Sequence, residues 1–204
     1  MDINVNKSLD KWLDEIDGQE LPDYDKLPDI ELYMEQMLTY LENQSKVLQK
    51  NSNDKQITSS MINNYVKHKI VQAPKAKKYS KEQLSLLNEL IYLKQVLSLP
   101  EIKQILDIEY KDNEYKVEYN KYLDINNNSF NEAVKETKNS LKSCKENDEK
   151  DLADLALKLA AKANAYSTVS KRILYLLKIL EHVKEQNEEY RQTSIEDILA
   201  KEDN

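Results

Sequence analysis

The chain has 204 residues, among them one glycine, four prolines, one cysteine and two histidines. With a single glycine, Gly18, it cannot build a glycine-rich phosphate loop or a series of primed hairpin turns, which excludes nucleotide-binding α/β folds and turn-rich β folds. One cysteine excludes an internal disulfide, and no Cys or His cluster offers a zinc site, so we expect no cofactor and no metal. Because charged residues make up 33% and glycine is so rare, we expect an all-α fold.

The sequence shows no secretion signal and no membrane span. Its first residues are charged and lack an apolar stretch, unlike a signal peptide. The longest apolar run covers residues 173–177, whereas a membrane helix needs about 20 apolar residues. We therefore expect a cytoplasmic protein with no membrane partner.

Charge is distributed unevenly along the chain. Between Lys55 and Lys81 there are seven lysines and no Asp or Glu, so this window carries +7. Because the net charge of the whole chain is −7, the remaining residues carry −14. A basic island in an acidic protein predicts an anionic partner at that island, although a lysine cluster can also arise by chance in a lysine-rich chain.

The region before the island is predicted to hold two helices. Residues 6–17 place Leu9, Trp12, Leu13 and Ile16 on one face of a short helix. Residues 18–27 read as a loop, and Pro28 suits the first position of a longer helix. The apolar stripe of that helix would be Ile30, Tyr33, Met34, Met37, Leu38, Leu41, Val47 and Leu48. The polar residues 50–56 would end it.

Within the island, a short helix over residues 58–68 would be followed by a small β-wing or extended loop over residues 70–79. Pro74 prevents helix there, and Ile70 and Val71 are β-branched. Ser80 and Gln83 form a capping-box pattern for a next helix. That helix would bury Leu84, Leu87, Ile91 and Val96, and after a break at 97–99 Pro100 would start a helix with Ile102, Ile105 and Leu106.

A helix with a polar face followed by a basic wing is typical of DNA-binding proteins. Asn63 and Asn64 carry amides that can pair with adenine N6 and N7 in the major groove. Ser59 and Ser60 lie at the helix N-terminus, where backbone N–H groups can hold a phosphate. The lysines expected to contact phosphates are Lys67, Lys69, Lys75, Lys77 and Lys78.

Each of these residues also has a plain structural interpretation. Exposed Asn63 and Asn64 can simply be solvated. Tyr65 lies on the apolar face and is expected in the core, with its hydroxyl as a candidate phosphate contact. Tyr79 is expected to close the wing as a core residue, and His68 to lie on the surface beside it.

Residues 57–106 resemble the MerR-type winged helix-turn-helix. Asn64 and Tyr65 stand where that family has an aromatic pair, and Tyr79–Ser80 matches its tyrosine before a Ser-capped helix. The family has an Arg at the position of Asn63, a Gly near Lys69 and a longer wing, so its detailed phosphate contacts do not transfer to Asn63. The resemblance implies DNA binding by the helix and wing.

The chain also resembles an uncharacterised bacterial family, domain of unknown function 1836, over about residues 6–108. The resemblance lies in the phrases LPDIELYMEQM, ITSSMINNYVKHKIV, PKAKKYSKEQL and LKQVLSLPEIKQIL. It implies a MerR-like regulator-type domain at 1–108, and it implies no established ligand or target.

The second half, residues 109–204, is predicted to be a helical hairpin or bundle. Residues 110–145 carry spaced apolar side chains, and the INNNS segment at 125–129 is a candidate break. From 148 to 190, apolar residues follow a heptad pattern interrupted by Lys162 and Asn187. Packing would use Leu152, Leu155, Leu159, Tyr166, Val169, Ile173, Leu176, Leu180 and Val183. This helix can fold back within the chain or dimerise, and residues 194–204 read as a separate short capped helix.

No nucleophile elbow, metal spacing or glycine loop supports an enzyme, and Cys144 lies on an apolar stripe. We therefore expect a sequence-specific DNA-binding protein, a homodimeric transcriptional regulator that reads double-stranded DNA with residues 58–68 and 70–79. The second half would dimerise, or bind an unidentified effector or protein partner. The alternative is a protein-interaction adaptor in which acidic residues of the second half cover the lysines.

Overall fold

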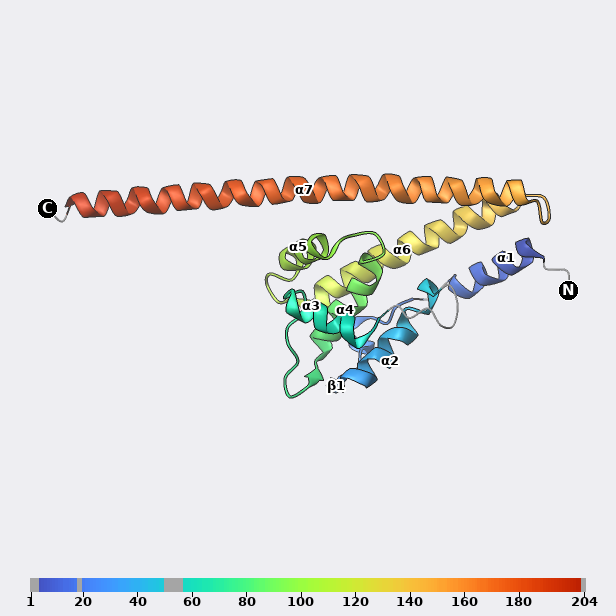
Figure 1. The fold of residues 1–204 in the computed structure, drawn as a ribbon, viewed down its shortest axis with the longest axis horizontal. Helices are drawn as coiled ribbons and strands as arrows, with labels where there is room; N and C mark the ends of the chain where they lie inside the picture. The colour runs from blue at the N-terminus through green and yellow to red at the C-terminus, as the bar shows by residue number, and fades with distance from the viewer. Residues whose placement is uncertain (1–3, 18–19, 50–56, 203–204) are drawn as a thin grey trace. The chain divides into compact units, whose positions relative to one another are not determined.

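The computed structural model describes residues 4–17, 20–49 and 57–202, and side chains up to 187. The predicted polar end of the second helix, residues 50–56, lies outside the described residues. Contacts divide the chain into two compact units, residues 1–162 and 163–204. The helices are α1 Val5–Ile16, α2 Met34–Gln44, α3 Ser59–Lys67, α4 Lys81–Leu93, α5 Leu99–Glu109, α6 Tyr115–Leu141 and α7 Glu149–Glu202 (Figure 1). The expected all-α fold with a small β element is confirmed.

Helix α4 is the centre of the first unit. Every residue from Gln83 to Ile91 is buried, and Leu87 and Leu90 have no exposed surface. A helix that is buried on all sides needs neighbours on all sides, and α2, α5 and α6 pack against it. The helix starts as predicted, with the Ser80 amide donating to Gln83 Oε1 at 2.8 Å. It ends at Leu93, so Val96, which was expected in its core, lies beyond the helix and is 49% exposed.

The polar residues buried on α4 bond to different neighbours. Asn88 Nδ2 donates to the Tyr119 hydroxyl of α6 at 3.1 Å. Glu89 accepts a 2.8 Å hydrogen bond from the hydroxyl of Tyr110, the C-cap residue that follows α5. Since a buried polar group without a partner costs about 1–3 kcal/mol, these bonds fix which element lies against which side of α4.

The helix expected from Pro28 begins six residues later, at Met34. Leu32 and Tyr33 form strand β1 instead, which pairs antiparallel with β2, Lys78–Tyr79. Gln36 Oε1 accepts from the Tyr33 amide at 3.0 Å and so fixes the helix start. As a result Ile30 is 71% and Tyr33 52% exposed, and neither belongs to a buried helical stripe.

Two short 3-10 helices flank these elements. Tyr24–Lys26 forms η1 within the predicted loop, and Lys46–Leu48 forms η2. Because α2 ends at Gln44, Val47 and Leu48 are not part of its stripe. Val47 instead packs against Leu13, Ile16 and Val134, which form a small core between α1 and α6.

The start of the described chain is tied to the turn between α6 and α7. The amide of Val5 donates to Asn147 Oδ1 at 2.7 Å, and the amide of Asn147 donates to Asn6 Oδ1 at 2.8 Å. Helix α1 extends as predicted, with Asn4 accepting from the Lys7 amide at its start. Leu13 and Ile16 are buried, whereas Trp12 is 44% exposed.

Helix α6 runs without interruption through the INNNS segment, so the break considered at 125–129 does not occur. Each Asn costs helix up to about 0.7 kcal/mol relative to Ala. Apolar contacts on both sides of the segment offset that cost, with Tyr119 and Leu123 in one cluster and Val134 in another.

Helix α7 is likewise a single helix to Glu202, so the separate short helix expected after 194 is wrong. No glycine or proline follows Pro100 in the sequence, and nothing in the local backbone therefore stops the helix. The beginning of α7 lies on α6. Leu155 is 7% exposed, and Lys158 and Lys162 both pair with Glu136.

In the described residues, no helix has a stretch long and apolar enough to cross a membrane. The division of roles between residues 1–108 and 109–204 stays a prediction.

Glu89 is predicted to make stability depend on pH. Burial raises the pKa of its carboxyl from the ordinary 4.5 to about 7. At a pH between about 4.5 and 7, Glu89 keeps its proton in the folded chain and has lost it in the unfolded chain. The free energy of unfolding therefore falls as the pH rises through this range. We expect a loss on the order of 3 kcal/mol across this window, measured by urea unfolding. Glu89→Gln should flatten the slope, whereas Glu132→Gln, at an exposed position, should not; equal slopes in wild type and Glu89→Gln would contradict the assignment.

Candidate nucleic-acid interface

Helix α3 presents a polar face and buries an apolar one. Thr58 caps it, with its hydroxyl accepting from the Met61 amide at 3.3 Å. Ile62 is fully buried and Tyr65 is 3% exposed, which anchors the helix in the first unit. The exposed residues are Ser60, Asn63, Asn64 and Lys67, as the 3-4 spacing predicted, and Ser59 is half-buried.

The end of α3 is a Schellman motif with lysine in place of glycine. The Ile70 amide donates to the Tyr65 carbonyl, and the Lys69 amide donates to the Val66 carbonyl, both at 3.0 Å. Lys69 has a φ of 55°, the left-handed conformation that glycine adopts most easily. This motif directs Ile70 and Val71 into the core, where they are 7% and 1% exposed.

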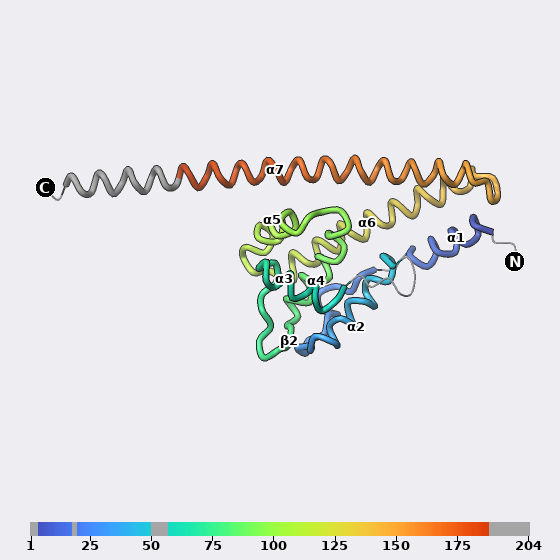
Figure 2. The backbone as a smooth tube through the Cα atoms, viewed as in Figure 1, coloured from blue at the N-terminus to red at the C-terminus, as the bar shows by residue number. Residues whose placement is uncertain are grey.

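The loop that follows ends in a tight turn. Ala76 and Lys77 both have positive φ, 47° and 63°, and the Lys78 amide donates to the Lys75 carbonyl at 2.9 Å. Two successive left-handed residues are typical of a type I′ turn, here built without glycine. The expected small β element is present within residues 70–79, because Lys78–Tyr79 form β2 and Lys75 forms an antiparallel bridge with Lys78 across the turn. Strand β2 pairs with β1 rather than with Ile70 and Val71. The course of the chain from α3 to β2 can be followed in Figure 2.

Several contacts hold this loop against the rest of the unit. Gln83 Nε2 on α4 donates to the Gln72 carbonyl at 2.7 Å, and Tyr79 is 3% exposed, as predicted for a residue that closes the loop. The Lys78 ammonium lies 5.2 Å from the centre of the Tyr33 ring. No local pattern predicts the contact between Lys78 and Tyr33, because that contact depends on pairing between strands far apart in the chain.

The loop and the end of α3 carry the exposed lysines. Lys67, Lys69, Lys75 and Lys77 are exposed, Lys78 is half-buried, and His68 is exposed as expected. Within the residues described, no ion pair joins any of these five lysines to an acid. Lys81, at the edge of the basic island, differs: it pairs with Asp29 and lies 5.1 Å from the centre of the Tyr24 ring.

Tyr65 lies in the core rather than on the polar face of α3. Burial raises the pKa of its hydroxyl above the ordinary 10, so the group stays neutral at physiological pH. The surface of α3 and the loop therefore carries Asn63, Asn64 and the five lysines, whereas Tyr65 lies apart from them in the core.

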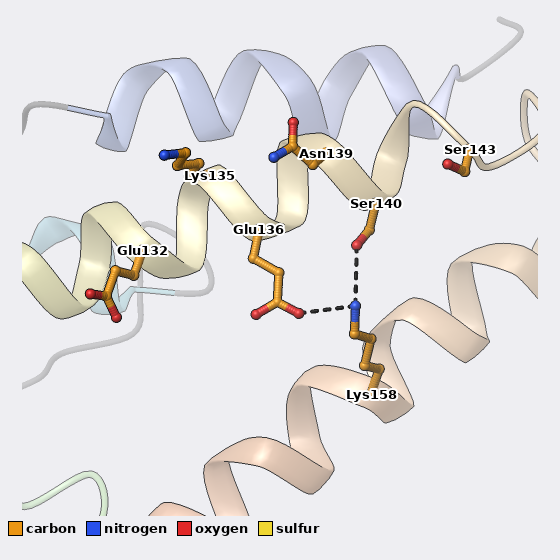
Figure 3. Close-up of a pocket in the computed structure, with 7 residues that line it drawn as sticks. All are labelled: Glu132, Lys135, Glu136, Asn139, Ser140, Ser143 and Lys158. Carbon is orange, nitrogen blue, oxygen red and sulfur yellow. Dashed lines mark hydrogen bonds and ion pairs between the residues drawn. The ribbon is translucent and has the colours of Figure 1, made fainter.

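The described part of the first unit has at least two hollows. One of about 520 Å³ adjoins the end of α3 and is lined mainly by apolar residues, including Val66, Ile70, Leu106 and Tyr110. The other, of about 540 Å³, lies between α6 and α7, where Lys158 reaches Glu136 at 2.9 Å and Ser140 (Figure 3). The described part of the chain has no cluster of His, Cys, Asp and Glu suited to a metal. The half-buried Cys144 thiol donates to the Ser140 carbonyl at 3.5 Å.

The fold and this surface define a helical protein with a basic, loop-bearing face. A family model described as Domain of unknown function (DUF1836) matches residues 22–125, from the segment before η1 into α6. The chain belongs to this family. The match includes α3, the loop and α4, and excludes α1 and α7. A search of the curated proteins and a search of the solved structures each found no match.

The turn at Ala76 yields a stability prediction. A side chain in the left-handed region costs about 1–2 kcal/mol, which glycine avoids. Glycine also has a larger conformational entropy in the unfolded chain, which offsets part of this gain. Ala76→Gly should therefore raise the free energy of unfolding by roughly 0.5–1 kcal/mol. Ala73→Gly is the matched control, because the exposed Ala73 has no positive φ, and it should lower stability. Urea unfolding measures both, and a destabilised Ala76→Gly variant would contradict the turn.

Proposed function

We propose that this chain binds double-stranded DNA sequence-specifically as a homodimeric, non-enzymatic transcriptional regulator of the cytoplasm. Helix α3 would enter the major groove and the lysine-bearing loop would contact the backbone. The observation that carries the proposal is the set of exposed lysines around the polar face of α3, for which the described residues provide no acidic partner.

Phosphate binding suits the loop because its lysines stand on an anchored backbone. The bond from Gln83 to Gln72 and the pairing of β2 with β1 fix both ends of the loop. Lys75 and Lys77 are exposed on the tight turn, and the described residues place no acid in an ion pair with either of them. The exposed Lys67 and Lys69 extend the positive charge to α3. Lysines placed this way gain free energy by releasing counterions from DNA.

Base reading would fall to α3. Asn63 and Asn64 are exposed while Ile62 and Tyr65 hold the helix in place, so the amides are available without loss of core packing. An Asn amide paired with adenine discriminates against other bases by about 1–3 kcal/mol. The exposed Ser60 and half-buried Ser59 lie in the first turn, where free N–H groups favour a phosphate.

The order of elements supports a MerR-like winged helix-turn-helix. Helix α2 packs on α3, the loop follows, and the buried Tyr79 precedes Ser80 at the start of α4 and then α5. Lys69 has the left-handed backbone conformation that favours glycine, near the place where that family has a glycine. The hollow beside the end of α3 is the place we assign to an effector.

The test replaces Lys75, Lys77 and Lys78 with Glu and measures retention of DNA at several salt concentrations. If each copy neutralises about four phosphates, wild-type dimer affinity falls with salt at a log–log slope of roughly −7. The triple variant should lose retention at physiological salt. A wild-type slope near zero would contradict the lysine assignment.

The matched control makes the same charge change elsewhere on the surface, at the exposed Lys111, Lys145 and Lys150. It should retain DNA. If both triple variants lose DNA equally, net charge alone accounts for binding and the assignment of the loop is overturned. If neither binds less but the loop variant unfolds more easily in urea, the lysines serve the fold or a protein partner, as an adaptor would require.

A further inference from the structure

In the part of the chain that the structure describes, the beginning of the heptad pattern of α7 packs against α6 within the first unit. Leu155 is 7% exposed, Leu152 and Leu159 are half-buried, and Lys162, at a heptad position that is otherwise apolar, pairs with Glu136 of α6. The first unit ends at this ion pair. The polar interruption at Lys162 therefore belongs to the hairpin with α6, and it separates that hairpin from the pattern that follows.

Beyond Lys162 the same pattern continues on an exposed face. Tyr166 is 75%, Val169 60%, Ile173 53% and Leu176 50% exposed. The next heptad is similar, with Leu180 at 49% and Val183 at 46%, and Leu177 and Ile179 beside them at 36% and 45%. Burying a side chain of this size is worth about 1.5–3 kcal/mol, so a contiguous stripe of them is a strong site for association.

We propose that a second copy of this chain covers the stripe from Tyr166 to Val183 in a parallel, in-register two-stranded coiled coil. Tyr166, Ile173 and Leu180 would face their own counterparts at a positions, and Val169, Leu176 and Val183 at d positions. This deepens the proposed homodimer by naming where and in which orientation the copies meet. It does not depend on DNA binding.

The residues that flank the stripe fit a second copy in this register. In a parallel pair each g position faces the next e position of the partner. Arg172 then lies opposite Leu177, and Ile179 lies opposite Lys184. No pair of like charges is brought together, and the aliphatic stems of Arg172 and Lys184 cover the two apolar side chains.

Orientation and copy number follow from the residues at a and d. Asn187 stands at the next a position, and an Asn at a faces another Asn only when the helices run parallel and in register. Ile173 at a with Leu176 at d favours a two-stranded coiled coil. Leu180 at a with Val183 at d is the arrangement, Leu at a and a β-branched residue at d, that favours trimers or tetramers. Asn187 decides between them, because a buried Asn at a specifies the dimer.

The test is cysteine cross-linking of the full chain without DNA, in a Cys144→Ser background. Val169→Cys and Val183→Cys are made separately, about 21 Å apart along the helix. In a parallel, in-register dimer each variant forms a disulfide with its own copy. An antiparallel pair cannot bring both positions to their counterparts, so cross-linking at one position only overturns the orientation. Lys178→Cys is the control, because f positions point away from the partner and should not cross-link.

Sedimentation equilibrium gives the second readout. Wild type should have twice the mass of one chain, and Leu176→Glu, which changes an exposed side chain and so leaves the fold intact, should be monomeric. A monomeric wild type, a tetramer, or a dimer unaffected by Leu176→Glu overturns the proposal. A monomer that still retains DNA overturns this inference and the proposed homodimer but not the proposed DNA binding, and a parallel dimer that retains none overturns the proposed DNA binding and leaves this inference standing.

Discussion

The burial of α4 on all sides is the constraint on which the first unit depends. A helix with Leu84, Leu87 and Leu90 inside and buried Asn88 and Glu89 between them cannot stand at a surface. It requires a neighbour for each side, and hydrogen-bond partners for the Asn88 Nδ2 group and the Glu89 carboxyl. Tyr119 of α6 and Tyr110 at the end of α5 supply the hydroxyls, so the positions of these elements follow from the needs of α4.

The candidate interface is built outward from the same helix. Gln83, in the first turn of α4, holds its own capping box with one end of its amide and the Gln72 carbonyl with the other. The loop is thus fixed near its start by α4 and at its end by the pairing of Lys78 and Tyr79 with β1. A core that fixes the loop so closely leaves Lys75 and Lys77 free of any packing role, which is what a surface for an anionic partner requires.

Local signals in the sequence predicted most of the helices, whereas long-range pairing was invisible to it. The Ser80–Gln83 capping box and the face of Ile62 and Tyr65 depend on neighbours three or four residues apart, and both are confirmed. Pro28 suggested a helix start, yet Leu32 lies in a strand that pairs with Tyr79, more than forty residues away in the sequence. The three consecutive Asn residues at 126–128 in α6 suggested a break, but packing on either side overrides their weak helix propensity. The charge pattern alone predicts the lysines of the candidate site. The contact of Lys78 with the Tyr33 ring and the bond from Gln83 to the Gln72 carbonyl depend on the fold and could not be predicted from the sequence.

The most direct test of the central claim is selection of fragmented genomic DNA by the full chain at physiological salt, with competitor DNA, followed by sequencing. The account predicts enrichment of one inverted repeat, because two copies related by two-fold symmetry read two half-sites. If no fragment is enriched, and lowering the salt retains no DNA either, the exposed lysines do not serve DNA and the account is contradicted.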